Sequence, residues 1–230
     1  MQKIAFTTSI PVEILLAANK VPVDLNNIFI ADQQAAAMVE KAEEAGYPRN
    51  TCGWIKGLYS VALESQPEAV IAVMQGDCSN TQALMETLLL KDQKILPFAY
   101  PFDRERKPLE EQFARLMAFL GVTWDEVTAA WENLKYVRKL CRELDLMTWR
   151  DNLVSSQENH YYLVSSSDFN GNPAQFAKEA GAFIREARER TPYRNEIRIG
   201  FMGVPPVFTD IYQYLEERGA RVVFNEVQRQ

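Results

Sequence analysis

The sequence predicts an α/β protein with two parallel-sheet units and a helical segment between them. The first 25 residues follow a strand–helix–strand pattern, which predicts parallel strands joined by a right-handed crossover. The apolar run Val70–Met74 passes directly into a helical pattern, as a buried parallel strand does. Residues 102–150 carry no strand pattern, and strand patterns return after residue 195. We therefore expect an α/β unit over 1–101, a helical segment over 102–194 and the start of a second α/β unit over 195–230.

The N-terminal unit contains apolar, β-branched runs that predict the strands Lys3–Thr8, Val21–Leu25, Val70–Met74 and Lys94–Phe98. Helical spacing predicts helices from Pro11, over Ala31–Ala45, from Asn50 or Thr51, and from about Asn80. Pro11 suits a first helical turn, where its missing N–H costs nothing. Asn50 or Thr51 can cap the third helix through its side-chain oxygen.

The middle segment is expected to be helical. One helix runs from Pro108 to Gly121, and Thr123 with Glu126 has the spacing of a capping box that begins a long helix. The apolar stripe of that helix contains Val127, Trp131, Leu134, Val137, Cys141 and Leu144. Tyr161–Ser165 is an apolar run of undetermined type, and Asn172 opens a helix that extends to about Arg190.

The last segment contains the predicted strands Ile197–Met202 and Arg221–Phe224, with a helix over Val207–Arg218 between them. Two strands and one helix cannot bury a sheet on both faces. We therefore expect either a truncated chain or a partner that completes this second unit.

Composition narrows the class of protein. The 230 residues carry a net charge of −6, which argues against nucleic acid as the main partner. No apolar run approaches the roughly 20 residues that span a bilayer, and the N-terminus lacks the pattern of a secretory signal. Three widely spaced cysteines do not form a disulfide framework. A reducing cytoplasm is the expected location.

Cys78 and Cys52 are the candidate site residues. Cys78 lies where the strand Val70–Met74 gives way to a helix, and open α/β sheets bind ligands beyond the carboxyl ends of their strands. Cys52 lies at the start of the preceding helix. The positive end of a helix dipole favours the thiolate, which is the form that binds metal. Spacing alone leaves open a purely structural role for both cysteines, because a free cysteine is commonly a small buried apolar residue.

Other polar or reactive residues have simpler interpretations. Cys141 lies on an apolar stripe and is expected in the core, and His160 is expected to serve packing rather than catalysis. Asp77 and Glu13 are expected to cap or to face a helix dipole. The tryptophans Trp54 and Trp131 are expected in the core. A solvated, charged helix face is expected for Arg185, Arg188 and Arg190. Gly200–Gly203 lacks the spacing of a phosphate-binding loop, so no nucleotide site is assigned.

Several segments together resemble the 2-hydroxyacyl-CoA dehydratase and benzoyl-CoA reductase family. They are Ser9–Ala18 followed by Val21-Pro22-Val23, Thr51–Gly57, Gly76–Asn80, Ile199–Gly203 and Glu216–Val223. The resemblance covers most of the chain in order and is weakest in the helical middle. It implies two flavodoxin-like, Rossmann-like lobes with a [4Fe-4S] cluster held by three cysteines, of which Cys52 and Cys78 match the first two.

The resemblance also implies the chemistry. Such a protein would work as a dimer with a homologous subunit, receive an electron from an ATP-dependent activator protein, and act on an acyl-CoA by one-electron, ketyl-radical chemistry. It would then be a lyase subunit of the dehydratase type. No catalytic residue is assigned from the sequence.

The chain departs from the family pattern at the third cysteine. Residues Asn225–Gln228 occupy that region without a cysteine, so Gln228 stands in the third-ligand position or the ligand lies beyond residue 230. Two alternatives therefore remain. The first is a non-catalytic binding or assembly subunit of the same fold that lacks a complete cluster, and the second is a small-molecule binding protein with structural cysteines.

Overall fold

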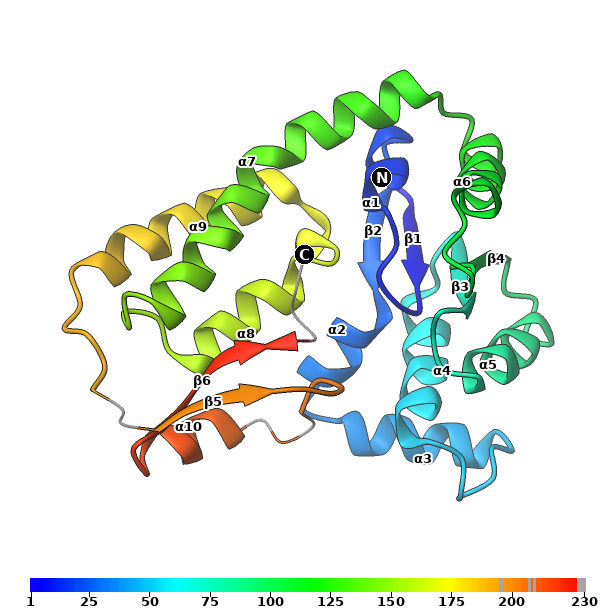
Figure 1. The fold of residues 1–230 in the computed structure, drawn as a ribbon. Coiled ribbons are helices and arrows are strands. Elements are labelled where there is room, and N and C mark those ends of the chain that lie inside the picture. Colours follow the sequence, from blue (N-terminus) through cyan, green and yellow to red (C-terminus); the bar gives the residue numbers. More distant parts are fainter. Residues whose placement is uncertain (195–196, 207, 209, 227–230) are drawn as a thin grey trace. The chain divides into compact units, whose positions relative to one another are not determined.

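A computed structural model describes residues 1–194, 197–206, 208 and 210–226 (Figure 1). They form two compact units, Met1–Glu132 and Asn133–Gln230. Each unit contains a parallel sheet, which confirms the predicted α/β fold with a larger and a smaller sheet. The finer division at residues 101 and 194 stays a prediction. In the described part of the chain, no helix has the length and apolar character needed to cross a bilayer.

The first unit is organised around a four-stranded parallel sheet with the order β2-β1-β3-β4. The strands are β1 (Lys3–Phe6), β2 (Val21–Asp24), β3 (Ala69–Gln75) and β4 (Ile95–Ala99). Ala5 of β1 lies opposite Val23 on one side and Val70 on the other. The chain moves from β1 outward to β2 and then crosses to β3 on the other side of β1, so the strand order reverses between β1 and β3. Ligands of open α/β sheets bind beyond the strand ends at such a reversal.

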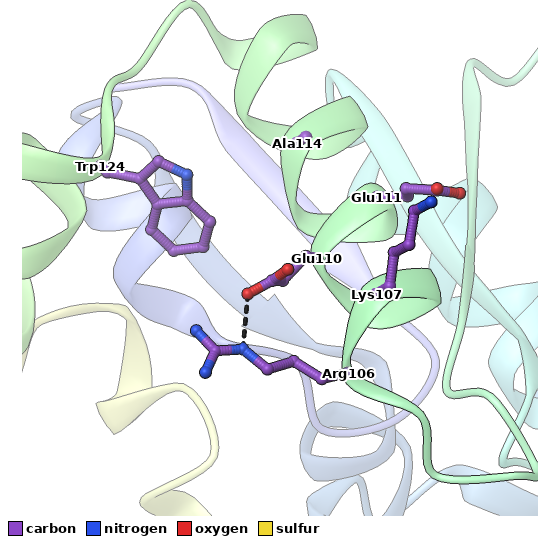
Figure 2. A pocket seen from close by; sticks show the side chains of 6 residues that line it. All are labelled: Arg106, Lys107, Glu110, Glu111, Ala114 and Trp124. Carbon is purple, nitrogen blue, oxygen red and sulfur yellow. Dashed lines mark hydrogen bonds and ion pairs between the residues drawn. The ribbon is translucent and has the colours of Figure 1, made fainter.

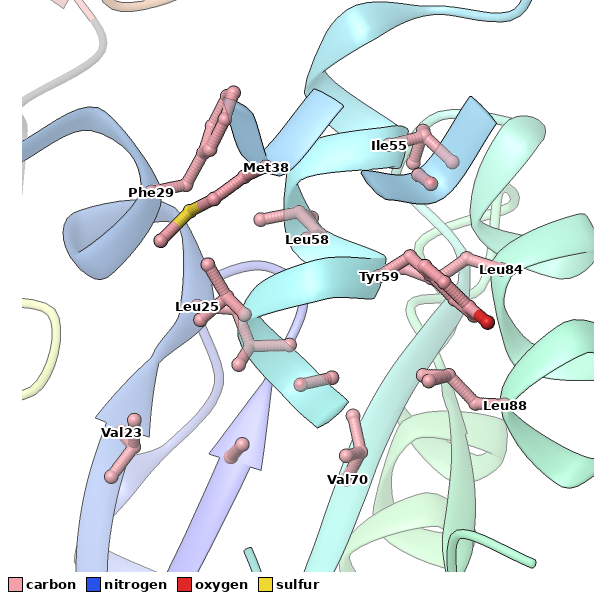
Figure 3. Close-up of a cluster of buried hydrophobic side chains, with 14 residues drawn as sticks. Val23, Leu25, Phe29, Met38, Ile55, Leu58, Tyr59, Val70, Leu84 and Leu88 are labelled. Atoms are coloured by element: carbon pink, nitrogen blue, oxygen red, sulfur yellow. The ribbon is translucent and has the colours of Figure 1, made fainter. Parts of the chain in front are cut away.

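Helices cover both faces of this sheet. They are α1 (Val12–Ala17), α2 (Leu25–Ala31), α3 (Ala35–Glu44), α4 (Gly53–Ser65), α5 (Asn80–Leu89) and α6 (Arg106–Leu120). Figure 3 shows one buried cluster, which includes Leu58 and Tyr59 of α4 together with Phe29, Leu84 and Val70. The alternate strand residues Ile4, Phe6 and Ile71 are also fully buried, as expected for a parallel sheet covered on both faces.

Helix α2 is absent from the sequence-based expectation, which ran a strand as far as Leu25. The carboxylate of Asp24 accepts a hydrogen bond from the Asn26 amide at 2.9 Å, so Asp24 ends β2 and caps α2 at once. Asp at an N-cap satisfies an otherwise unpaired helical N–H, which here outweighs the apolar run as a guide to the element boundary.

The second unit contains the C-terminal part of α7 (Trp124–Trp149), a helix that begins in the first unit. The other elements are α8 (Ser156–Ser165), η1 (Phe169–Gly171), α9 (Pro173–Arg188), β5 (Ile197–Phe201), α10 (Ile211–Glu216) and β6 (Ala220–Asn225). Among the residues that the structure describes, β5 and β6 form a two-stranded parallel sheet. The fully buried Arg221 of β6 donates hydrogen bonds to the carbonyl oxygens of Thr148 and Val154, at 2.7 and 2.8 Å, and so anchors the sheet to the turn after α7.

These helices answer three questions that the sequence raised about the middle segment. Cys141 is 3% exposed, which confirms its place in the core. Trp131 is 45% exposed, so its assignment to the core is wrong: the apolar stripe of α7 is narrower than the three-and-four spacing suggested. The run Tyr161–Ser165 proves to be the end of α8, which Ser155 and Glu158 begin with a capping box.

Candidate functional site

Cys52 and Cys78 lie at the starts of two helices that flank β3. Cys52 is the N-cap residue of α4, which leads into β3, and Cys78 lies in the turn between β3 and α5. Helices that enter and leave the same parallel strand both begin at that strand's carboxyl end. The fold therefore brings both residues to the carboxyl edge of the first sheet, and both are exposed free cysteines.

Tyr100 holds the turn that carries Cys78. Its amide donates to the Gln75 carbonyl oxygen at 2.9 Å, and its hydroxyl donates to the Ser9 carbonyl oxygen at 2.9 Å. Gly76 has a φ of +91°, and a Cβ there would lie 2.8 Å from the Tyr100 Cβ. Glycine is required at this position on both counts. Burial, and then the nearby carboxylate of Glu13, raises the pKa of Tyr100 to about 12, so its phenol stays protonated and serves as a donor.

Polar side chains surround Cys78. The Asn80 Nδ2 lies 3.5 Å from the Cys78 Sγ and donates to it. The Asp77 carboxylate accepts hydrogen bonds from the Cys78 amide and, at 3.2 Å, from the Thr81 hydroxyl. Burial raises the pKa of Asp77 above its usual range, partly opposed by these two hydrogen bonds. The expectation that Asp77 serves the start of a helix is consistent with this geometry.

Cys52 is the N-cap residue of α4, a place that the sequence assigned to Asn50 or Thr51. Its side chain forms no capping hydrogen bond, while its carbonyl oxygen accepts from the Lys56 amide at 3.2 Å. Two residues later, the Trp54 Nε1 donates to the Asn26 Oδ1 at 2.6 Å. Asn26 in turn donates to the Thr7 carbonyl oxygen at 2.8 Å. The start of α4 is thereby fixed to the end of β1.

Sequence reasoning missed Tyr100, Asn80 and Asn26 as residues of this edge. Tyr100 could have been found, because it follows the β4 strand directly and parallel strands end at a common edge. Asn26 depends on helix α2, which the sequence pattern did not reveal.

The remaining candidates lie elsewhere or outside the described residues. Burial raises the pKa of the Cys141 thiol to about 11, so this thiol is protonated at neutral pH. Burial lowers the pKa of His160 to about 4, and its Nδ1 lies 3.0 Å from the Tyr212 hydroxyl. Gln228 lies outside the described residues. Arg190, which follows the end of α9, pairs with Glu158 at 2.9 Å.

A groove of about 590 Å³ lies along α6 in the first unit (Figure 2). Its lining residues are Arg106, Lys107, Glu110, Glu111, Ala114 and Trp124. The Nε of Arg106 pairs with the Glu110 carboxylate at 2.6 Å, and charges of both signs are exposed along it. It contains neither Cys52 nor Cys78.

The two exposed thiols fit iron–sulfur chemistry in ligand type, because thiolates are the usual protein ligands of such clusters. They do not complete a ligand set. Within residues 1–194, 197–206, 208 and 210–226, no three His, Cys, Asp or Glu side chains are grouped so that they could hold a metal ion.

The model of the family described as "2-hydroxyglutaryl-CoA dehydratase, D-component" matches residues 7–230. The chain belongs to this family. A search of curated proteins found no match. The family match confirms the resemblance that the cysteine segments indicated, and membership in the 2-hydroxyglutaryl-CoA dehydratase D-component family points to a component of 2-hydroxyacyl-CoA dehydratase systems.

Proposed function

We propose that this protein is an iron–sulfur component of a 2-hydroxyacyl-CoA dehydratase or acyl-CoA reductase system, with Cys52 and Cys78 as cluster ligands. One observation carries the proposal. In a chain of the dehydratase family, the cysteines of both family-like segments are exposed at helix starts on one edge of a parallel sheet. When bound, a [4Fe-4S] cluster would supply the single electrons that ketyl-radical chemistry on a CoA thioester requires.

The chain's own residues would prepare the two thiols. The N-termini of α4 and α5 provide partial positive charge at this edge of the sheet. Asn80 adds a hydrogen bond to the Cys78 sulfur at 3.5 Å. Tyr100 and Gly76 fix the backbone of the turn between β3 and α5. Fixed donors around a thiolate lower the reorganisation needed when a ligand binds.

The proposal includes partners of stated kinds. A homologous subunit would form a homo- or heterodimer with this chain, an ATP-dependent activator would deliver electrons, and an acyl-CoA would be the substrate. A cytoplasmic location follows from the same chemistry, because exposed thiols stay reduced there. The family match supports the partner subunit and the activator as a class.

The test is iron and sulfide content per chain after anaerobic reconstitution and desalting. The wild-type chain is compared with Cys52→Ser, Cys78→Ser and, as a matched control, Cys141→Ser. We expect the first two variants to lose iron and the third to retain the wild-type content, because Cys141 is buried in α7. Equal iron content in all four proteins would contradict the assignment of the ligands.

The third ligand determines how firmly a cluster is held. Each thiolate anchors the cluster and sets its potential, so two thiolates alone should hold it weakly. Gln228 in the third-ligand position stays a prediction. If it is correct, Gln228→Cys raises the iron retained after desalting. Full and stable occupancy in the unmodified chain would show that no third thiolate is missing.

A non-catalytic binding or assembly subunit is the second candidate function. It is favoured by the absence of a three-ligand group among the described residues. The same measurement separates the two candidates, because an assembly subunit would stay free of iron both as the natural chain and as Gln228→Cys, yet would still bind its homologous subunit.

A further inference from the structure

Lys56 is a buried lysine that the site described above does not use. Its side chain is 3% exposed and lies in α4, one helical turn after Cys52. A buried ammonium group is strongly unfavourable unless it is paired and hydrogen-bonded. The presence of a buried lysine on the helix that begins at Cys52 therefore needs a physical reason.

The ammonium group has two partners outside its own helix. The Lys56 Nζ lies 2.6 Å from the Glu43 Oε1, near the end of α3, and donates to the Arg49 carbonyl oxygen at 3.1 Å. Arg49 belongs to the segment 46–52 that connects α3 to α4 and ends at Cys52. Arg49 lies within a turn of this segment, in which the Thr51 amide donates to the Pro48 carbonyl oxygen at 2.9 Å.

We propose that Lys56 is a positioning residue for Cys52: neutralised by Glu43, it holds the Arg49 carbonyl and so fixes the backbone that presents the Cys52 thiol. The proposal rests on the function proposed for Cys52. Glu43 compensates the buried charge, while the hydrogen bond to the carbonyl oxygen transmits the constraint to the connecting segment. The side chain of Arg49 is 94% exposed, and its Nε lies 3.8 Å from Glu43, so this second contact adds little.

A purely structural role, in which Lys56 only joins α3 to α4, is the competing explanation. The same two helices offer a comparison, because the Lys41 Nζ on α3 pairs with Glu64 near the end of α4 at 2.5 Å. Those side chains are 60% and 45% exposed, and they lie at the opposite end of α4 from Cys52. Lys41→Gln removes an α3–α4 ion pair and serves as the matched control.

The variants separate positioning from stability. Lys56→Met alone leaves Glu43 and the Arg49 carbonyl without their partner and can impair folding. The double variant Lys56→Met/Glu43→Gln removes the charge pair as a unit, which proteins often tolerate, and also removes the hydrogen bond to Arg49. This double variant provides the decisive test, and it is compared with wild type and with Lys41→Gln.

Hydrogen exchange of the full chain without iron, resolved by peptide mass spectrometry, provides the first measurement. We expect the Thr51 and Lys56 amides, which are bonded to the Pro48 and Cys52 carbonyls, to exchange roughly tenfold faster in the double variant. The rest of α3 and α4 should be unchanged, and Lys41→Gln should match wild type. Unchanged exchange over 46–56, or faster exchange spread evenly along α3 and α4, would overturn the proposal.

Iron per chain after anaerobic reconstitution and desalting provides the second measurement. We expect the double variant to retain several-fold less iron than wild type and Lys41→Gln. Equal retention in all three proteins would refute the positioning role. If wild type and Gln228→Cys both stay free of iron, the proposed function is refuted instead, and the exchange result then decides alone whether Lys56 fixes the segment.

Discussion

Gly57→Ala should destabilise the first unit, because α2 crosses α4 at Gly57 with no room for a side chain. A Cβ at Gly57 would lie 2.1, 2.3 and 2.4 Å from three ring atoms of Phe29. Figure 3 shows the Phe29 ring beside Met38 in the buried cluster. The nearest ring atom would have to move by about 1.3 Å, from 2.1 Å to the 3.4 Å at which ordinary contact begins.

Phe29 cannot make that movement freely. It is 8% exposed, and its ring packs edge-on against Trp54 with 5.6 Å between centroids. Overpacking of a core costs about 1–3 kcal/mol, and loss of a buried Phe about 3–5 kcal/mol. Alanine recovers about 1 kcal/mol through its higher helix propensity. The two ranges less this gain meet at about 2 kcal/mol, which is the net loss that we expect in the free energy of unfolding.

The chain has two compact units, so a single global transition is an unsuitable measure of stability. Native-state hydrogen exchange of the α4 amides reports the opening free energy of the first unit directly. Gly53→Ala is the control, because the nearest atom to its Cβ would be the Val39 Cγ2 at 3.9 Å. That variant should be neutral or slightly stabilising. A Gly57→Ala protein as stable as Gly53→Ala would refute the close packing of α2 on α4.

Three further predictions follow from single residues. Cys141→Ala should cost at most about 1–2 kcal/mol in unfolding free energy and leave iron content unchanged; loss of iron would place Cys141 at the metal site. Because the pKa of His160 is about 4 in the folded protein against an ordinary 6.5, the unfolded chain binds the proton first. Stability of the second unit should therefore fall between pH 6.5 and pH 4 by up to about 3 kcal/mol, and His160→Gln should remove that slope, as native-state hydrogen exchange of the α8 amides at each pH can show. Cys52→Ser should raise the stability of α4 by about 0.5–1 kcal/mol, because serine is a better N-cap, as hydrogen exchange of its first turn can show.

Element positions were predictable where one signal controls the local structure. The capping boxes and caps are examples, since the Thr123 amide donates to the Glu126 carboxylate at 2.7 Å and Asn172 caps α9 through a 3.1 Å hydrogen bond from the Gln175 amide. The same kind of signal at Ser155 and Glu158 predicts α8, although the apolar pattern of Tyr161–Ser165 did not resolve it.

Predictions failed where two signals compete. Asp24 lies in an apolar run that favours a strand, yet its carboxylate begins α2. Trp131 has helical spacing with Leu134 and Val137, but only these two are buried. The edge location of Cys52 and Cys78 was predictable from strand and helix order alone. The hydrogen bond of the Tyr100 hydroxyl to Ser9 was not, because it joins segments 91 residues apart in the sequence. Those of Asn80 and Lys56 are closer in sequence, but they depend on side-chain conformations that the residue pattern does not determine.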